Sequence, residues 1–167
     1  MMQFLVRAGE EKDFAEIARI YRHYVLNSTA TFELDPPRAE TMSERAAEIS
    51  RLGLPYLVAE TEGSVVAYAY ASAYRPRPAY RFTVEDSVYV DPEYAGQGCG
   101  RLLLSALLDS CAKGPWRQMI AVIGDSANVR SVRLHEHLGF RHVGVLHAVG
   151  FKFDKWIDTV LMQRMLG

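Results

Sequence analysis

Three glycines, Gly96, Gly98 and Gly100, alternate with other residues in the stretch YAGQGCGRLLL, which continues directly into leucines. The segment before it, RFTVEDSVYV, has the alternation of a strand, and the segment after it is predicted to be a helix ending near Lys113. Glycine costs conformational entropy on folding, so this density at the start of a helix needs a cause. A strand, a glycine-rich turn and a helix together offer free backbone N–H groups and a positive helix end, which favours an anion site.

Two common phosphate-binding patterns do not fit this loop. GxxxxGK[ST] is absent because Gly100 is followed by Arg101 and Leu102, and GxGxxG fails because the glycines alternate. Asp125, after the run AVIG, offers the acidic residue of a dinucleotide fold, but that fold needs several strand–helix–strand units and only one is clear here. A tight turn in which glycine only fills space is the structural alternative.

The rest of the chain alternates strands and helices in a mixed order. Strands are predicted at QFLVRAG, YLVAE, SVVAYAYASAY and QMIAVI, with two more in FRHVGVLHAVGFKFDKWIDTVLMQRM, and helices over about 13–25, 39–51 and 128–138. RPRPAY is predicted to be irregular because of its prolines. The 167 residues show no linker or repeat. We therefore expect a single domain, 1–167, of α/β or α+β class, with a mixed central sheet flanked by helices.

Composition argues against several classes of partner. The net charge is −1 and no basic run exists, so no nucleic-acid partner is expected. No run of 18 apolar residues occurs, and Arg7 interrupts the N-terminus before a signal-peptide core, so we expect no membrane partner. Cys99 and Cys111 suit a reducing cytoplasm and lack the spacing of a metal site, so no metal is expected.

Two further patterns suggest buried polar groups. In RFTVEDSVYV, Asp86 breaks the alternation, which predicts a β-bulge near residues 85–87, and Glu85 inside this strand is a candidate base with a raised pKa. A strand with one solvated face is the alternative. Asn128, Ser131 and His135 fall in the apolar arc of the predicted helix 128–138 and need partners from the protein or from a ligand.

Several runs together resemble a known family. VYVDPEYAGQGCGRLLLSALL and AVIGDSANVRSVRLHEHLGF resemble the acetyl-CoA-binding half of the GNAT superfamily of N-acetyltransferases. TFE at 31–33, RFTVEDSVYV, LHEHLGF and GFKFDKWID resemble its phosphinothricin and methionine sulfone/sulfoximine acetyltransferases. The resemblance implies a GNAT acyl-CoA N-acyltransferase fold. It also implies transfer from acetyl-CoA to the α-amine of a small amino acid such as phosphinothricin, L-methionine sulfone or L-methionine sulfoximine.

The resemblance also implies an acetyl-CoA site. The glycine loop would wrap the pyrophosphate while the preceding strand pairs with the pantetheine arm through its backbone. The implied residues are Val88, Tyr89, Val90, Gly96, Gln97, Gly98, Cys99, Gly100, Arg101, Asn128 and Ser131. The family pattern Arg/Gln-x-x-Gly-x-Gly/Ala has Ala95 at its first position here, so this loop lacks that basic or amide side chain, which Gln97 could partly replace.

For catalysis, the resemblance implies Glu85 as the general base, directly or through a water. A backbone N–H near Val88 or Tyr89 would hold the oxyanion. His135 stands where most relatives carry the tyrosine that protonates the thiolate, so an acid or a base-relay role is expected. The sequence leaves open which of Glu85 and His135 takes the first proton.

The implied substrate site completes the expectations. Its residues are Thr31, Phe32, Glu33, Arg75, Pro76, Arg77, Tyr80, Glu85, Asp86 and Ser87, with Trp156 as a further aromatic candidate. Arg75 and Arg77 suit bidentate recognition of a carboxylate or phosphinate, unless they are solvated arginines of a surface turn. A homodimer with the site near its interface is also implied. Acetylation of a peptide or another amine, and a non-catalytic CoA-binding sensor, are the rival functions.

Overall fold

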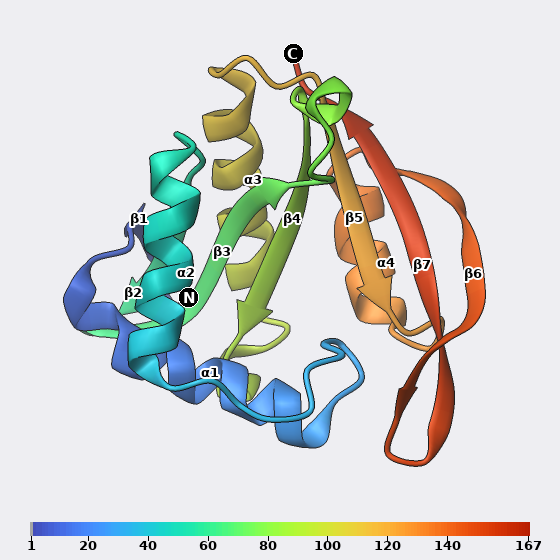
Figure 1. Cartoon of the computed structure of the whole chain (residues 1–167). Helices are drawn as coiled ribbons and strands as arrows, with labels where there is room; N and C mark the ends of the chain where they lie inside the picture. The colour runs from blue at the N-terminus through green and yellow to red at the C-terminus, as the bar shows by residue number, and fades with distance from the viewer. Residues whose placement is uncertain (1) are drawn as a thin grey trace.

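Among residues 2–167, which the computed structural model describes, seven strands form one sheet in the order β1-β2-β3-β4-β5-β7-β6 (Figure 1). The strands are β1 (Leu5–Ala8), β2 (Tyr56–Thr61), β3 (Ser64–Ala73), β4 (Thr83–Val90), β5 (Gln118–Gly124), β6 (Arg141–Lys152) and β7 (Lys155–Met165). Every neighbouring pair is antiparallel except β4 and β5, which run parallel. The sheet is therefore mixed, and the predicted α/β or α+β class is confirmed.

Helices cover both faces of this sheet. Figure 1 shows α1 (Phe14–Asn27) and α2 (Ala39–Arg51) in front of it, and α3 (Cys99–Ala112) and α4 (Val129–His137) behind it. Three short 3₁₀ turns, η1 (Glu11–Asp13), η2 (Pro78–Tyr80) and η3 (Pro92–Tyr94), lie in the connections. None of the helices within residues 2–167 is both long and apolar enough to cross a bilayer.

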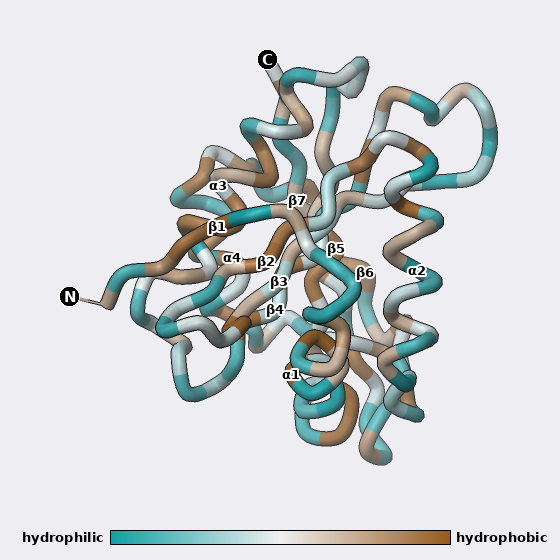
Figure 2. The backbone as a smooth tube through the Cα atoms, turned by 90° about the vertical axis from the view of Figure 1, so that its left-hand side faces the viewer, coloured by the Kyte–Doolittle hydropathy of each residue, from teal (hydrophilic) through white to brown (hydrophobic). Residues whose placement is uncertain are grey.

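The periodicity of apolar residues accounts for these layers. Along α1, Ile17, Tyr21 and Val25 are buried on one face, and along α3 Leu103 and Leu107 are fully buried against the other side of the sheet. Figure 2 shows hydrophobic stretches on strands of the sheet and on the helices that pack against it, with hydrophilic or neutral segments between them. The core thus lies on both faces of β2, β3 and β4.

The parallel pair β4–β5 opens toward its carboxyl ends. The two strands are paired only through residues 83–86 of β4 and 118–121 of β5. Beyond this short ladder, β4 continues to Val90 and β5 to Gly124 without pairing to each other. This leaves an open wedge in the middle of the sheet, at the ends of strands where ligands bind in many α/β proteins.

Two local expectations were wrong. The predicted bulge near residues 85–87 is absent, because β4 pairs with β3 in one continuous register from Val84 to Val90. Asp86 stays in register on the buried face, where a histidine side chain bonds to it, so the chain has no need to turn the carboxylate outward. The run RPRPAY is also not wholly irregular, since its last three residues form η2.

Candidate active site

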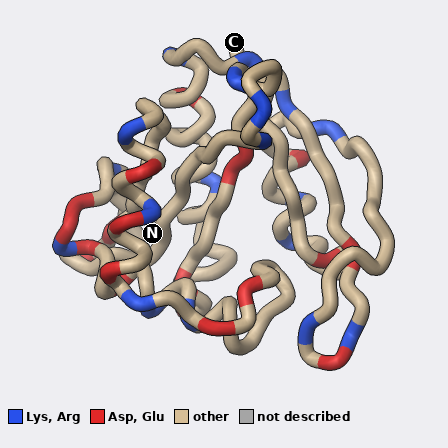
Figure 3. Tube along the Cα trace, viewed as in Figure 1, with Lys and Arg blue, Asp and Glu red and all other residues tan. Residues whose placement is uncertain are grey.

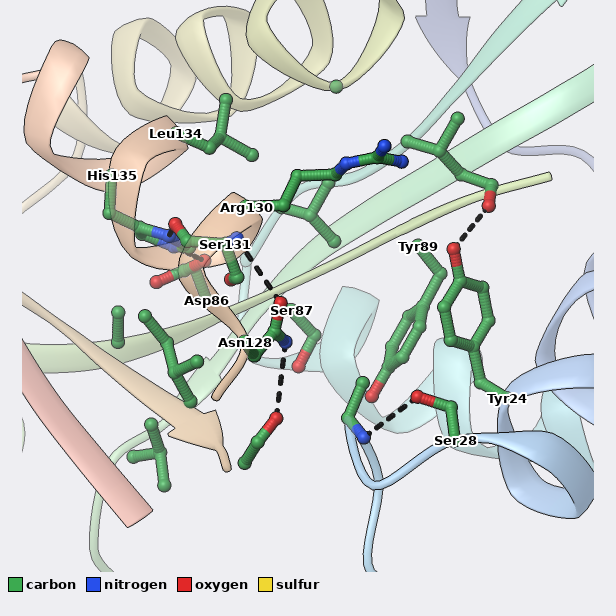
Figure 4. Close-up of a pocket in the computed structure, with 18 of the residues that line it drawn as sticks. Tyr24, Ser28, Asp86, Ser87, Tyr89, Asn128, Arg130, Ser131, Leu134 and His135 are labelled. Carbon is green, nitrogen blue, oxygen red and sulfur yellow. Dashed lines mark hydrogen bonds and ion pairs between the residues drawn. The ribbon is translucent and has the colours of Figure 1, made fainter. Parts of the chain in front are cut away.

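A cavity of about 840 Å³ occupies the wedge between β4 and β5 (Figure 4). Its walls come from both strands, from the loop before α3, from the first turns of α4 and from the loop that follows α1. The predicted residues that line it are Phe32, Glu85, Asp86, Ser87, Val88, Tyr89, Val90, Gly96, Gly98, Gly100, Arg101, Asn128, Ser131 and His135. The wedge therefore brings together the loop, strand and helix motifs from distant parts of the sequence.

The glycines of the loop have two separate causes. Gly96 and Gly98 have φ angles of +79° and +88°, in the left-handed region that L side chains rarely adopt. Gly100 lies in the first turn of α3, where a Cβ would come within 3.3 Å of the Val90 side chain. The first amides of α3 have no partner within the helix and no side-chain cap, so they are available to an anion in the cavity. The backbone conformation and the packing at Gly100 explain the glycines, and the uncapped amides leave anion binding as a prediction.

Glu85 contributes a titratable carboxylate to the cavity. The side chain is half-buried on β4, and desolvation, followed by the charge of Asp86, raises the pKa of Glu85 to about 7. The charge of Arg75 works in the opposite direction. A carboxyl group with this pKa exists in both protonation states near neutral pH, which is the property of an efficient general base.

His135 forms a buried pair with Asp86. Its Nε2 lies 2.9 Å from Asp86 Oδ2, and its Nδ1 lies 2.7 Å from the carbonyl oxygen of Ser131. Because the carbonyl only accepts, Nδ1 carries a proton, and a second proton lies between Nε2 and the carboxylate. Burial acts to lower the pKa of His135, but the hydrogen bond and charge of Asp86 outweigh it, so the pKa is raised.

Asn128 fixes the start of α4 beside the wedge. Its side-chain Oδ1 accepts a hydrogen bond from the Ser131 amide at 3.3 Å, and its Nδ2 donates to the carbonyl of Gly124 at 3.1 Å (Figure 4). The residue thus caps the helix and ties it to the end of β5. The inward polar stripe predicted on this helix is explained by these bonds together with those of His135.

Comparisons with known proteins identify the family. The model of the Acetyltransferase (GNAT) domain matches residues 6–161. The chain belongs to the GNAT family of acetyltransferases. This GNAT acetyltransferase is 55% identical over 161 residues to a phosphinothricin N-acetyltransferase of Alcaligenes faecalis, covering 96% of the chain and 82% of the relative.

Two further relatives agree with this family. An L-methionine sulfoximine/L-methionine sulfone acetyltransferase of Salmonella typhimurium is 39% identical, with 96% of this chain and 94% of the relative covered. The crystal structure of a GNAT phosphinothricin acetyltransferase from Sinorhizobium meliloti in complex with AcCoA superposes with a TM-score of 0.96 at 48% identity, covering 99% of this chain and 90% of that one.

Several predicted residues of the GNAT acetyltransferase lie outside the cavity. Gln97 does not line the cavity, and its Nε2 donates to the carbonyl of Glu93 at 3.0 Å, so its contact with the cofactor stays a prediction. Cys99 is buried in α3, and burial raises the pKa of its thiol to about 11. Only the middle residue of TFE lines the wedge: Thr31 is buried 2.7 Å from the hydroxyl of Tyr21, and Glu33 pairs with an arginine of α2.

The arginine-rich loop lies at the other end of β4. Arg75, Pro76, Arg77 and Tyr80 precede β4, whereas the cavity opens toward the carboxyl end of that strand. Figure 3 shows basic positions gathered at this end of the molecule, close to acidic positions near the start of β4. Arg75 stacks on the ring of Tyr74 at 5.1 Å. These residues do not line the cavity of the single chain, and their substrate contacts stay a prediction.

Two features of the site were not predicted: a buried lysine that holds the loop after α1, and two glycines that make room for an aromatic ring. Lys152 is buried and its Nζ donates to the carbonyls of Ser28 and Thr31 at 2.7 and 2.8 Å, which fixes the loop after α1. The ring of Phe32 fills the space left by Gly124 and Gly150, where a Cβ would overlap with it. The only sign of the Lys152 contacts in the sequence was a lysine within a strand of alternating residues. Among the described residues, no group of three or more His, Cys, Asp or Glu side chains is placed to hold a metal ion.

Proposed function

We propose that this GNAT acetyltransferase transfers the acetyl group of acetyl-CoA to the α-amine of a small amino acid with an oxygen-rich side chain, of the phosphinothricin, L-methionine sulfone and L-methionine sulfoximine class. The observation that carries the proposal is the wedge itself. The Glu85 carboxylate, with a pKa of about 7, and a glycine loop followed by uncapped helix amides line one cavity, in a chain 55% identical to a phosphinothricin N-acetyltransferase.

The residues present fit acetyl-CoA as the donor. The close approach of α3 to β4 at Gly100, which a Cβ would obstruct, leaves bare backbone around the first turn of α3 for a pyrophosphate. Above the short β4–β5 ladder, β4 has no strand partner on its wedge side, so its backbone groups there, apart from the Val90 carbonyl that the Tyr24 hydroxyl occupies, are available to an extended arm such as pantetheine. The proposed donor contacts are therefore Val88, Val90, Gly98, Gly100 and Arg101.

Along β4 the backbone amides point alternately toward β3 and into the wedge, and this alternation supports one of the two predicted oxyanion donors. The Asp91 amide donates to the Val66 carbonyl on β3 at 2.8 Å, so the amides of odd residues of this segment point toward β3. The amides of even residues then point into the wedge. We therefore assign the oxyanion contact to the N–H of Val88 and not to that of Tyr89.

The two titratable groups take different roles in this proposal. Glu85 accepts a proton from the substrate ammonium, directly or through a water, so that the free amine can attack the thioester carbonyl. His135 already holds protons at both ring nitrogens or shares one with Asp86, so it is a poor acceptor. His135 donates a proton to the sulfur as the C–S bond breaks and becomes neutral, after Asp86 has kept the imidazole charged up to that step, and the proton that Glu85 accepted passes to solvent. Glu85 is therefore the group that takes the first proton.

The test is thiol release from acetyl-CoA across a panel of amines. The panel holds L-methionine sulfone, L-methionine sulfoximine, phosphinothricin, the ordinary amino acids, a polyamine and a short peptide. Rapid release with the sulfone, sulfoximine or phosphinothricin is the expected result. Release with the peptide alone would overturn the substrate class, and CoA binding without release for any amine would favour a sensor.

Two properties of the whole protein belong to the same proposal. We propose a homodimer, supported by exposed apolar side chains on the β6–β7 face: Val143, Leu146, Val149, Phe151 and Trp156. We also propose a cytoplasmic location, supported by Cys99 and Cys111, which are buried free thiols.

A further inference from the structure

The pyrophosphate loop of this chain lacks a basic side chain at its first position. Ala95 lines the cavity there, and Gln97 is turned back to the carbonyl of Glu93. The backbone amides of α3 remain, but a pyrophosphate carries formal charges that amides alone bind less strongly than a guanidinium does. Some other part of the cavity wall is therefore expected to supply positive charge.

Arg130 is a basic side chain that faces the loop from across the cavity. It stands in the first turn of α4, lines the wedge and extends across it in Figure 4 toward the end of β4. Its charge acts on the pKa of Tyr24, whose hydroxyl donates to the carbonyl of Val90 at 2.5 Å. The guanidinium therefore lies near the last residue of β4, just before the glycine loop.

The backbone at Arg130 is held in place, and its guanidinium forms no ion pair with the described residues. The bonds of Asn128 to the Ser131 amide and to the Gly124 carbonyl hold the first turn of α4 in place. Among residues 2–167, the ion pairs found do not include Arg130, and its side chain is exposed to the cavity. The other basic side chain that lines the wedge, Arg101, belongs to α3 on the opposite side of the loop.

We propose that Arg130 binds the pyrophosphate of acetyl-CoA from α4 and supplies the charge that the loop lacks at Ala95. The inference rests on the proposed function, since acetyl-CoA is the donor only there. Arg101 and the α3 amides contact the phosphates from one side, and Arg130 closes the site from the other. A guanidinium suits this task because its planar donors match two phosphate oxygens at once.

The test compares Arg130→Ala with the parent protein by calorimetric binding of CoA. We expect the dissociation constant to rise about tenfold, the usual range for a lost charge-assisted hydrogen bond. We also expect added salt to weaken CoA binding more in the parent than in the variant. Arg133→Ala, one turn further along the exposed side of α4, is the matched control and should bind CoA like the parent.

A phosphate-free donor and a rescue variant separate charge from structure. With S-acetylpantetheine, which has no phosphates, the KM of Arg130→Ala should equal that of the parent. Adding Ala95→Arg to Arg130→Ala should restore much of the CoA affinity. Equal CoA affinity in parent and Arg130→Ala, or equal losses for CoA and S-acetylpantetheine, would overturn the inference. A parent protein that binds no CoA would instead overturn the proposed function.

Discussion

Glu85 and His135 face one cavity but differ in how their protons are held. Both ring nitrogens of His135 lie within hydrogen-bond distance of oxygen atoms. Burial instead raises the pKa of Glu85 to about 7, so its carboxyl group is about half ionised at neutral pH. The proposed division between base and acid thus rests on which backbone and side-chain oxygens surround each group. The residue types alone could not assign it.

Glu85→Gln tests the proposed base. Because the pKa of Glu85 is about 7, we expect kcat/KM of the parent to rise with pH up to and through this value as the carboxylate forms. The variant should lose roughly 10²- to 10⁴-fold in kcat and also lose this ascending limb. CoA affinity should not change. A variant with parental turnover would remove Glu85 from the mechanism.

The same substitution should stabilise the fold at alkaline pH. The folded pKa of Glu85, about 7, lies above its ordinary value of 4.5, so the folded state binds the proton more tightly than the unfolded chain does. Stability is therefore lost as pH rises from 4.5 toward 7, and the full penalty persists above 7. Glu85→Gln should gain roughly 1–3 kcal/mol in urea unfolding at pH 8, with almost no gain at pH 4. A gain that is independent of pH would contradict this origin.

At the scale of elements, the loop between α1 and α2 forms one wall of the cavity, where we propose that the amino-acid substrate binds. Lys152 bonds two of its carbonyls, and the hydroxyl of Thr29 bonds Asp125 at 2.6 Å. The ring of Phe32 then lies between the ends of β5 and β6, where Gly124 and Gly150 leave space for it. Three separate elements thus determine the position of a loop that has no regular structure of its own.

Lys152→Met should disturb this wall without touching the donor site. The loss of two buried hydrogen bonds from an ammonium is expected to raise the KM for the amino-acid substrate severalfold and to cost about 1–3 kcal/mol of stability. The dissociation constant for CoA should stay at the parental value. Lys155→Met, at the exposed start of β7, is the control and should change neither quantity. An equal loss in substrate and CoA binding would mean that the wall does not act locally.

The sequence predicted the elements well because their apolar spacing is regular. The helix expected over 39–51 has those bounds, and the glycine loop, Glu85 and His135 all line the predicted cavity. The errors concern side chains whose partners come from distant segments. The bulge was predicted because nothing local shows that Asp86 has a buried histidine partner. Arg130 was not among the predicted site residues because helical spacing does not show that the wedge lies next to the first turn of α4.

At the scale of the whole molecule, the edge of the sheet formed by β6 carries exposed apolar side chains. β6 is the last strand of the sheet, and Phe151 packs against Trp156 with ring centres 5.0 Å apart, although both rings are more than half exposed. Contiguous exposed apolar patches often mark protein contacts, and Val143, Leu146 and Val149 are also exposed on β6. They support the proposed homodimer.

Trp156→Glu should therefore weaken self-association. A charge placed within an apolar interface costs desolvation energy that the contact cannot recover, so the dissociation constant of the dimer should rise by at least tenfold. Sedimentation velocity at several concentrations measures this directly. Lys155→Glu, the neighbouring exposed position, serves as the charge control. Parental sedimentation of Trp156→Glu would exclude this face as the interface.

The interrupted ladder between β4 and β5 makes the amides of Val88 and Val90 natural reporters of occupancy. In the free protein these N–H groups lie beyond the last β4–β5 strand pair, so we expect them to exchange their hydrogens with solvent readily. A donor arm that pairs along β4 would complete the ladder and protect them. Under the proposed function the co-substrate would add one strand to the sheet, and deuterium uptake at these two backbone positions would show when that strand is in place.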